Sequence, residues 1–199
     1  MVALDLDNTI ICYANAFAAA ASEAGLDLSG VKGAHGKEAV KEAALLAGGN
    51  ALWTKIQGLA YGKNICEALP FPGVQEFFRK AAAGGIPLTI VSHKTQYAAA
   101  FPEIDLRTAA TDWLGAHGFV SNTGVTTYFC DSREEKVAVL RSLGCSGLLD
   151  DLPEVFRTPG FPSTTRFVLF DPAETFSTWS DTPRVRSWAE ASDLLLEDG

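Results

Sequence analysis

The chain opens with a short apolar run that ends in two closely spaced carboxylates. Val2–Leu6 predicts a buried first strand, with Asp5 and Asp7 at its end and the turn-prone Asn8 after them. On an alternating strand end, both Asp side chains project into one site, where their charges repel. Burying them costs several kcal/mol unless a cation or a proton compensates. A divalent metal is the simplest compensation, so this stretch predicts a Mg²⁺ site.

Apolar strands and amphipathic helices alternate along most of the remaining chain. Further strands are expected at Pro87–Ser92, Gly147–Asp150 and Arg166–Phe170, and helices at 74–83, 105–117, 133–143 and 185–196. Nearly continuous apolar strands that alternate with helices indicate a parallel sheet covered on both faces. The sequence therefore predicts an α/β fold with a Rossmann-like, doubly wound parallel sheet as its core.

An Ala-rich segment interrupts this alternation directly after the first strand. It reads as helices that are broken at Gly25–Gly36 and at Gly48–Asn50. We expect residues 13–69 to form a small α-helical cap, inserted into an α/β core domain made of residues 1–12 and 70–199. Such a cap would lie above the site that the core carries.

The polar residues of greatest interest follow three of the expected strands. Asp5 and Asp7 follow the first strand, Ser92 follows the second, and Asp150 and Asp151 follow a third. In open parallel sheets, ligands bind outside the carboxyl ends of the strands. We therefore expect these side chains to converge on one crevice.

Four motifs resemble those of the haloacid dehalogenase superfamily, in its phosphatase-like branch. They are Asp5-x-Asp7-x-Thr9, Ser92 at the end of an apolar strand, Lys136 near the start of a helix, and Asp150-Asp151 after a strand. Their order, spacing and context fit the family over about residues 1–171. Asn8 stands where the family's commonest form has Gly, and Asn tolerates the same turn conformations.

The resemblance implies separate roles for the acidic residues. Asp5 would be the nucleophile that forms an aspartyl-phosphate. Asp7 would be the general acid and then the general base, and its backbone carbonyl would ligate Mg²⁺. Asp151 would be the second carboxylate on the metal beside Asp5. Asp150 would instead orient Lys136.

The resemblance also implies a set of groups that bind the phosphoryl oxygens. Ser92, Thr9 and Lys136 belong to this set, and Lys136 would in addition keep Asp5 ionised. Taken singly, the motif residues also have structural interpretations. These are a turn cap for Asp5 and Asp7, an ordinary strand-end hydroxyl for Ser92, a solvated lysine for Lys136, and a helix N-cap for Asp150 and Asp151. Glu154 would then be a capping-box partner, or else a second acid that supports the site.

The presence of Asp7 bears on the type of reaction. By analogy with the family, the dehalogenase and phosphonatase branches lack an acid two residues after the nucleophile. An alkoxide leaving group needs a proton, whereas a halide does not. The implied function is a Mg²⁺-dependent phosphomonoesterase of a small phosphorylated metabolite. A phosphomutase with the same site stays open, as does a noncatalytic module that binds a phospholigand or docks a partner.

Substrate choice is expected to lie with the rim of the crevice and with the cap. His93 and Lys94 directly follow Ser92 at the rim, with Lys94 as the candidate substrate contact and His93 as structural or solvent-facing.

A cap loop contains glycines together with Lys32, His35 and Lys37, which suits a mobile anion-binding loop and a solvated linker equally well. Trp53 and Tyr61 could stack on a substrate ring, although their helical spacing favours the core of the cap.

Charge and cysteine usage limit the remaining possibilities. The chain has 16 basic and 24 acidic residues, a net charge of −8, which argues against binding to nucleic acid or to anionic membranes. We expect no secretory signal and no membrane span, because Asp5 and Asp7 interrupt the first apolar run and no later run is long enough to cross a bilayer. The four cysteines form no Cys-x-x-Cys pair, so we expect a reducing cytoplasm. Nothing in the sequence indicates an oligomeric state.

Overall fold

The computed structural model describes residues 1–29, 36–120 and 124–196. The chain divides into two compact units. The sheet unit consists of Met1–Ile10, Pro70–Lys94 and Gly118–Gly199, and the helical unit consists of Ile11–Leu69 and Thr95–His117.

A six-stranded sheet forms the centre of the sheet unit. Its strand order is β10-β9-β8-β1-β4-β7. The strands are β1 (Val2–Leu4), β4 (Leu88–His93), β7 (Thr126–Cys130), β8 (Gly147–Asp150), β9 (Arg166–Phe170) and β10 (Arg184–Val185). Every pairing in this sheet is parallel. The chain runs outward from β1 to β7 and then from β8 to β10, so the predicted doubly wound parallel sheet is confirmed.

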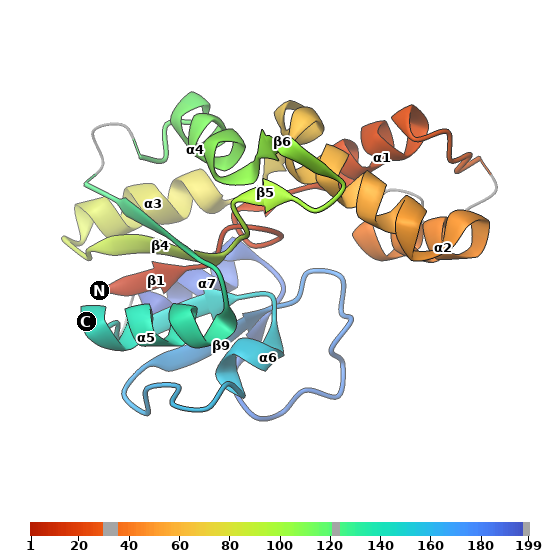
Figure 1. Cartoon of the computed structure of the whole chain (residues 1–199). Coiled ribbons are helices and arrows are strands. Elements are labelled where there is room, and N and C mark those ends of the chain that lie inside the picture. The colour runs from red at the N-terminus through yellow and green to blue at the C-terminus, as the bar shows by residue number, and fades with distance from the viewer. Residues whose placement is uncertain (30–35, 121–123, 197–199) are drawn as a thin grey trace. The chain divides into compact units, whose positions relative to one another are not determined.

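Helices cover both faces of this sheet (Figure 1). On one face lie α3 (Val74–Ala83) and α7 (Trp188–Leu195), which meet through an edge-on contact of Phe77 with Trp188, 4.9 Å between ring centroids. On the other face lie α5 (Arg133–Leu143) and α6 (Pro153–Phe156), whose Leu140 and Val155 share an apolar cluster with the strand residues Ala3, Val91 and Leu148. Burial on both faces explains why these strands are nearly continuous apolar runs.

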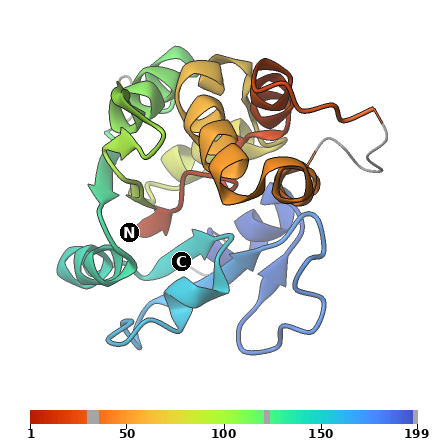
Figure 2. The same ribbon diagram turned by 45° about the vertical axis from the view of Figure 1, so that its right-hand side comes forward.

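The helical unit is built around α1 (Ala14–Glu23) and α2 (Lys37–Tyr61), which lie side by side (Figure 2). Phe17 of α1 stacks on Trp53 at 5.6 Å between ring centroids and meets Tyr61 edge-on at 5.4 Å. Trp53 and Tyr61 thus serve as core residues of this unit, the second of the two predicted alternatives. The predicted break at Gly48–Asn50 is confirmed, because Gly49 interrupts α2 with φ of +65°.

Three further elements belong to the helical unit. They are the 3₁₀ helix η1 (Lys63–Glu67), the hairpin of β5 (Tyr97–Ala98) and β6 (Phe101–Asp105), and α4 (Leu106–Ala116). Outside these, the two-residue strands β2 (Ile11–Cys12) and β3 (Leu69–Pro70) pair with each other.

The structure differs from the predicted domain boundaries at residues 11–12 and 95–117. The sequence assigns them to the core domain, but they pack within the helical unit. The Trp113 indole N–H of α4 donates to the Ala68 carbonyl oxygen at 3.0 Å, which ties α4 to the end of η1. Amphipathicity predicted this helix correctly, but it does not identify the surface against which the apolar face packs.

Several element boundaries also differ from the prediction. The first strand ends at Leu4 rather than at Leu6, and the last helix begins at Trp188, because Ser187 caps it by accepting a hydrogen bond from the Glu190 N–H. The strand β7 was not predicted. This strand lies at the sheet edge and most of it is half-exposed, so it lacks the continuous apolar run of the central strands.

Of the predicted cap loop, Lys32 and His35 lie outside the described residues, and Lys37 is the first residue of α2. Among the helices that the structure describes, none is both long and apolar enough to cross a membrane.

Candidate functional site

Three carboxylates come together at the carboxyl ends of β1 and β8. Asp5 follows β1, Asp150 ends β8 and Asp151 follows it. Leu4 pairs with Leu149 in the parallel register, and the Asp5 N–H donates to the Leu149 carbonyl oxygen at 2.9 Å. One carboxylate oxygen from each of the three Asp residues lies within 4.8 Å of the others. This acidic triad has the oxygen donors that a hard divalent cation prefers.

Lys136 of α5 pairs with two members of the triad. Its Nζ lies 2.5 Å from Asp5 Oδ1 and 2.7 Å from Asp150 Oδ2, and its side chain is 1% exposed. Ser132 caps α5 by accepting a hydrogen bond from the Glu135 N–H, and this start directs Lys136 to the buried face of the helix. The alternative of a solvated lysine is therefore wrong.

Both carboxylate oxygens of Asp150 have partners. Oδ1 accepts a hydrogen bond from the Leu152 N–H at 3.0 Å, while Oδ2 meets the Lys136 ammonium. The first contact fixes the Asp150 carboxylate, and the second lets it hold the lysine beside Asp5. The orienting role of Asp150 toward Lys136 stays a prediction, and this ion pair is the contact on which it depends.

Asp7 lies on the turn that follows β1. Asn8 adopts φ of +62° in this turn, which is the left-handed conformation. Asn tolerates this conformation, so the prediction that Asn8 can stand where the family's commonest form has Gly is confirmed. The Lys94 ammonium approaches both Asp7 oxygens, at 2.9 Å from Oδ1 and 2.6 Å from Oδ2.

Lys94 adjoins Asp7, and its side chain is buried rather than open at the rim. Its side chain is only 3% exposed, because the Asp7 carboxylate attracts the ammonium inward. Its main chain is held as well, since the Lys94 N–H donates to the Cys130 carbonyl oxygen at 2.9 Å. His93 is exposed, and its Nε2 lies 3.2 Å from the Asp131 carbonyl oxygen, which fits the predicted structural or solvent-facing role.

Two buried hydroxyl groups complete the predicted set. Ser92 is 1% exposed at the end of β4, and Thr9 is fully buried after the turn. Neither Oγ has a hydrogen-bond partner among the described residues. Because a buried hydroxyl without a partner is costly, both are suited to meet the oxygen of a bound ligand. The Thr9 carbonyl oxygen also accepts a hydrogen bond from the Trp188 indole at 3.2 Å.

Charge and burial determine the electrostatics of this site. The four carboxylates and two ammonium groups described above carry a net charge of −2 when all are ionised, which a divalent cation would neutralise. Burial raises the pKa of the Asp5 carboxyl to about 7; Lys136 opposes this shift, and Asp150 and Asp7 add to it. Although burial lowers the pKa of Lys136, the carboxylates of Asp150 and Asp5 outweigh it and raise that pKa above its usual range. The donor set and its charge therefore fit Mg²⁺.

We expect the stabilisation by Mg²⁺ to depend on pH. The fold raises the pKa of Asp5 from 3.8 to about 7, so the protonated carboxyl contributes stability that is complete below about pH 3.8 and is lost as the pH rises through about 7. A cation at Asp5 replaces this lost stability only where the carboxyl ionises. Melting temperatures should therefore rise more on Mg²⁺ addition at about pH 8 than at about pH 5.

The control for this measurement is Asp5→Asn, which cannot ionise at that position. Its melting temperature should depend less on pH over the same range, and its gain from Mg²⁺ should be smaller. Equal gains for the original protein at both pH values would contradict the assignment of Asp5 to the cation site.

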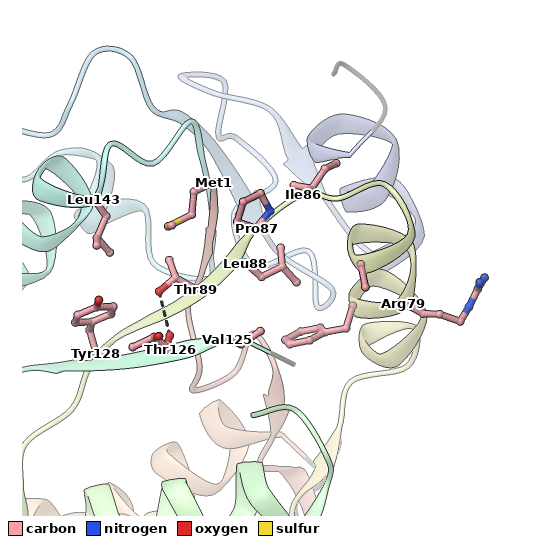
Figure 3. Close-up of a pocket in the computed structure, with 13 residues that line it drawn as sticks. Met1, Arg79, Ile86, Pro87, Leu88, Thr89, Val125, Thr126, Tyr128 and Leu143 are labelled. Carbon is pink, nitrogen blue, oxygen red and sulfur yellow. Dashed lines mark hydrogen bonds between the residues drawn. The ribbon is translucent and has the colours of Figure 1, made fainter. Parts of the chain in front are cut away.

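A cavity of about 540 Å³ lies at the other end of the strands from the acidic triad. Met1, Pro87 and Val125, which precede β1, β4 and β7, are among its lining residues (Figure 3). It is thus at the amino ends of the strands, and the carboxylates described above lie beyond their carboxyl ends.

No protein-family model and no curated protein sequence matches this chain. Solved structures do match it over almost its whole length. A HAD family hydrolase from Deinococcus radiodurans with bound phosphate and sodium is 16% identical, with a TM-score of 0.60, over 98% of this chain and 94% of that one. A HAD-type hydrolase from Bacillus subtilis bound to magnesium is 11% identical, with a TM-score of 0.59, over 98% and 97%. A predicted phosphoglycolate phosphatase from Haemophilus somnus 129PT is 13% identical, with a TM-score of 0.57, over 98% and 96%.

At these identities the likeness shows the fold. The chain has the fold of the haloacid dehalogenase superfamily hydrolases, and the resemblance drawn from its four motifs is confirmed at that level.

Proposed function

We propose that this protein is a Mg²⁺-dependent phosphomonoesterase that acts on a small phosphorylated metabolite through an aspartyl-phosphate on Asp5. One observation carries the proposal. Carboxylates that follow two adjacent parallel strands lie within 4.8 Å of one another, and a buried lysine pairs with two of them. The phosphatase and the phosphate-bound hydrolase among the structural neighbours support the same class of chemistry.

Asp5 is proposed as the nucleophile. Its Oδ would form a bond to phosphorus while the bond from phosphorus to the leaving oxygen breaks. Water would then attack the phosphorus of the aspartyl-phosphate, which releases inorganic phosphate and restores the carboxylate. Lys136, with its ammonium 2.5 Å from Asp5 Oδ1, favours the ionised carboxylate that this attack requires.

Asp7 is proposed to move the protons. It would donate one to the leaving alkoxide and then accept one from the attacking water. Ser92 and Thr9, whose buried Oγ atoms lack partners among the described residues, are proposed with Lys136 to bind the phosphoryl oxygens. These donors would stabilise the charge that develops on the transferred group.

Mg²⁺ would be held by the carboxylates of Asp5 and Asp151 and by the backbone carbonyl of Asp7. When bound, the ion would neutralise charge on the phosphoryl group and on the acidic triad. Asp150 is left out of this assignment because its two oxygens already engage Leu152 and Lys136. The magnesium in the structure of the Bacillus subtilis hydrolase supports the choice of metal.

We propose that the helical unit acts as the cap that selects the leaving group. It carries its own aromatic core of Phe17, Trp53 and Tyr61, as an independently packed cap would. A cytoplasmic location is proposed as well, because all four cysteines are free thiols.

The test is turnover of a panel of phosphate esters that includes 4-nitrophenyl phosphate. We expect inorganic phosphate to be released with Mg²⁺, and release to fall to background with EDTA and to return when Mg²⁺ is added in excess. Release of free phosphate, rather than formation of an isomeric ester, separates a hydrolase from a phosphomutase. Absence of metal-dependent turnover across the panel would overturn the proposed function and favour a noncatalytic module.

A further inference from the structure

Lys94 lies outside the four motifs, yet it meets a carboxylate as closely as Lys136 does. Its Nζ is within 2.9 Å of both Asp7 oxygens, whereas Lys136 Nζ meets one oxygen of each of its two partners. An ammonium that contacts both oxygens restrains the rotation of the carboxylate plane as well as its position. Lys94 is therefore placed to control how the Asp7 carboxylate is oriented.

The two partners differ in how firmly their surroundings hold them. The Lys94 main chain is held at the end of β4 by the hydrogen bond to the Cys130 carbonyl oxygen at the end of β7. Its side chain is 3% exposed, whereas that of Asp7 is 19% exposed and stands on the turn with the left-handed Asn8. The lysine is thus the fixed member of the pair, and Asp7 is the member that needs to be held.

We propose that Lys94 is a positioning residue, which holds the Asp7 carboxylate in the orientation required for proton transfer to the leaving oxygen. The inference rests on the proposed function, and Lys94 itself does not touch the reacting atoms. A general acid must lie within hydrogen-bond reach of the atom that it protonates, so a carboxylate that turns away loses its contribution. The alternative, a direct contact of Lys94 with substrate, requires a ligand to displace Asp7 from a side chain that is almost fully buried.

The test is a double-mutant cycle measured on two leaving groups. Lys94→Met keeps the length of the side chain and removes its charge, Asp7→Asn removes the acid, and the third variant combines them. Each is assayed on 4-nitrophenyl phosphate, whose phenolate leaves without a proton, and on an alkyl phosphate that the original protein hydrolyses. Lys94→Arg tests rescue by a retained charge, and Lys80→Met, on the exposed surface of α3, is the matched control.

We expect Asp7→Asn to lower kcat on the alkyl phosphate by ~10²–10⁴-fold. Lys94→Met should lower the same kcat by about 10- to 10²-fold, with little change in KM. Its loss of kcat/KM should be much smaller on 4-nitrophenyl phosphate, because kcat/KM covers the steps up to loss of the leaving group and excludes the later attack of water on the aspartyl-phosphate. Adding Lys94→Met to Asp7→Asn should then cost little more. Lys94→Arg should recover part of the loss, and Lys80→Met should match the original protein.

Three outcomes would overturn the positioning role while leaving the proposed function intact. They are an equal loss of kcat/KM on both leaving groups, a loss that persists in full beside Asp7→Asn, and a rise in KM with unchanged kcat, which would mark a substrate contact. Thermal unfolding of each variant shows whether it is folded, and if Lys94→Met is unfolded, Lys94→Arg is compared on the two leaving groups in its place. Absence of turnover by the original protein would instead overturn the proposed function, and the positioning role with it.

Discussion

Replacing Asp5 with Asn is expected to reduce phosphatase turnover by on the order of 10⁴-fold, because the amide cannot form the aspartyl-phosphate. The same change should leave the fold intact. Lys136 would still pair with Asp150 at 2.7 Å, and the buried carboxyl, whose pKa burial raises to about 7, would be replaced by a group that cannot ionise. We therefore expect the metal-free variant to melt at or above the temperature of the original protein at about pH 8, while its turnover is lost.

Asp171→Asn provides the matched control for this variant. Asp171 also follows a strand of the same sheet and is 3% exposed, but it accepts hydrogen bonds from the Thr175 and Phe176 N–H groups and pairs with Arg184 at 3.0 Å. Its replacement should lower the melting temperature and keep the turnover of the folded protein. If Asp5→Asn and Asp171→Asn behaved alike in both measurements, Asp5 would be a structural carboxylate.

The central strands were predictable because burial on both faces demands apolar runs. β4, β8 and β9 all fall within a residue or two of the predicted ranges for this reason. The position of polar residues after these runs then placed Asp5 beside Asp150, since carboxyl ends of neighbouring parallel strands meet at one edge. For these strands, the local sequence pattern was therefore enough to predict where the polar residues lie in the fold.

The sequence predicted less well which strand lies at the edge of the sheet and which unit residues 95–117 pack against. β7 reads Thr-Thr-Tyr-Phe-Cys, and its β-branched and aromatic residues were a usable signal despite the missing apolar run. The assignment of residues 95–117 to the helical unit had no comparable signal. It depends on contacts such as that of Trp113 with Ala68, which join segments far apart in the sequence.

The contacts of Lys94 also depend on a segment that is far away in the sequence. Its place directly after Ser92 predicts closeness to the crevice, which the contact with Asp7 supports. Burial of its side chain depends on where the turn after β1 places the carboxylate, and this turn is 87 residues away in the chain. The sequence therefore indicates which residues approach the site, whereas the pairing of each lysine with its own carboxylate emerges only in three dimensions.

That pairing makes Lys136 the residue whose loss should do the most combined damage. In Lys136→Met, Asp5 and Asp150 would remain buried and close together without the cation between them. Removal of one partner from a buried ion pair typically costs about 3–5 kcal/mol of stability. Turnover should fall by ~10²–10³-fold, since a donor to the phosphoryl oxygens is lost as well.

Melting curves with and without Mg²⁺ and turnover of 4-nitrophenyl phosphate would measure both effects, with Lys80→Met as the exposed-lysine control. At a pH that ionises both Asp5 and Asp150, the triad would then carry one more uncompensated negative charge, so Mg²⁺ should raise the melting temperature of Lys136→Met by more than that of the original protein. The double variant Lys136→Met/Asp5→Asn should regain part of the lost stability, since it removes one of the two unpaired carboxylates, while turnover stays absent. If Lys136→Met alone melted like the original protein, the ammonium would not compensate these carboxylates. Lys136 would then lose its proposed part in keeping Asp5 ionised.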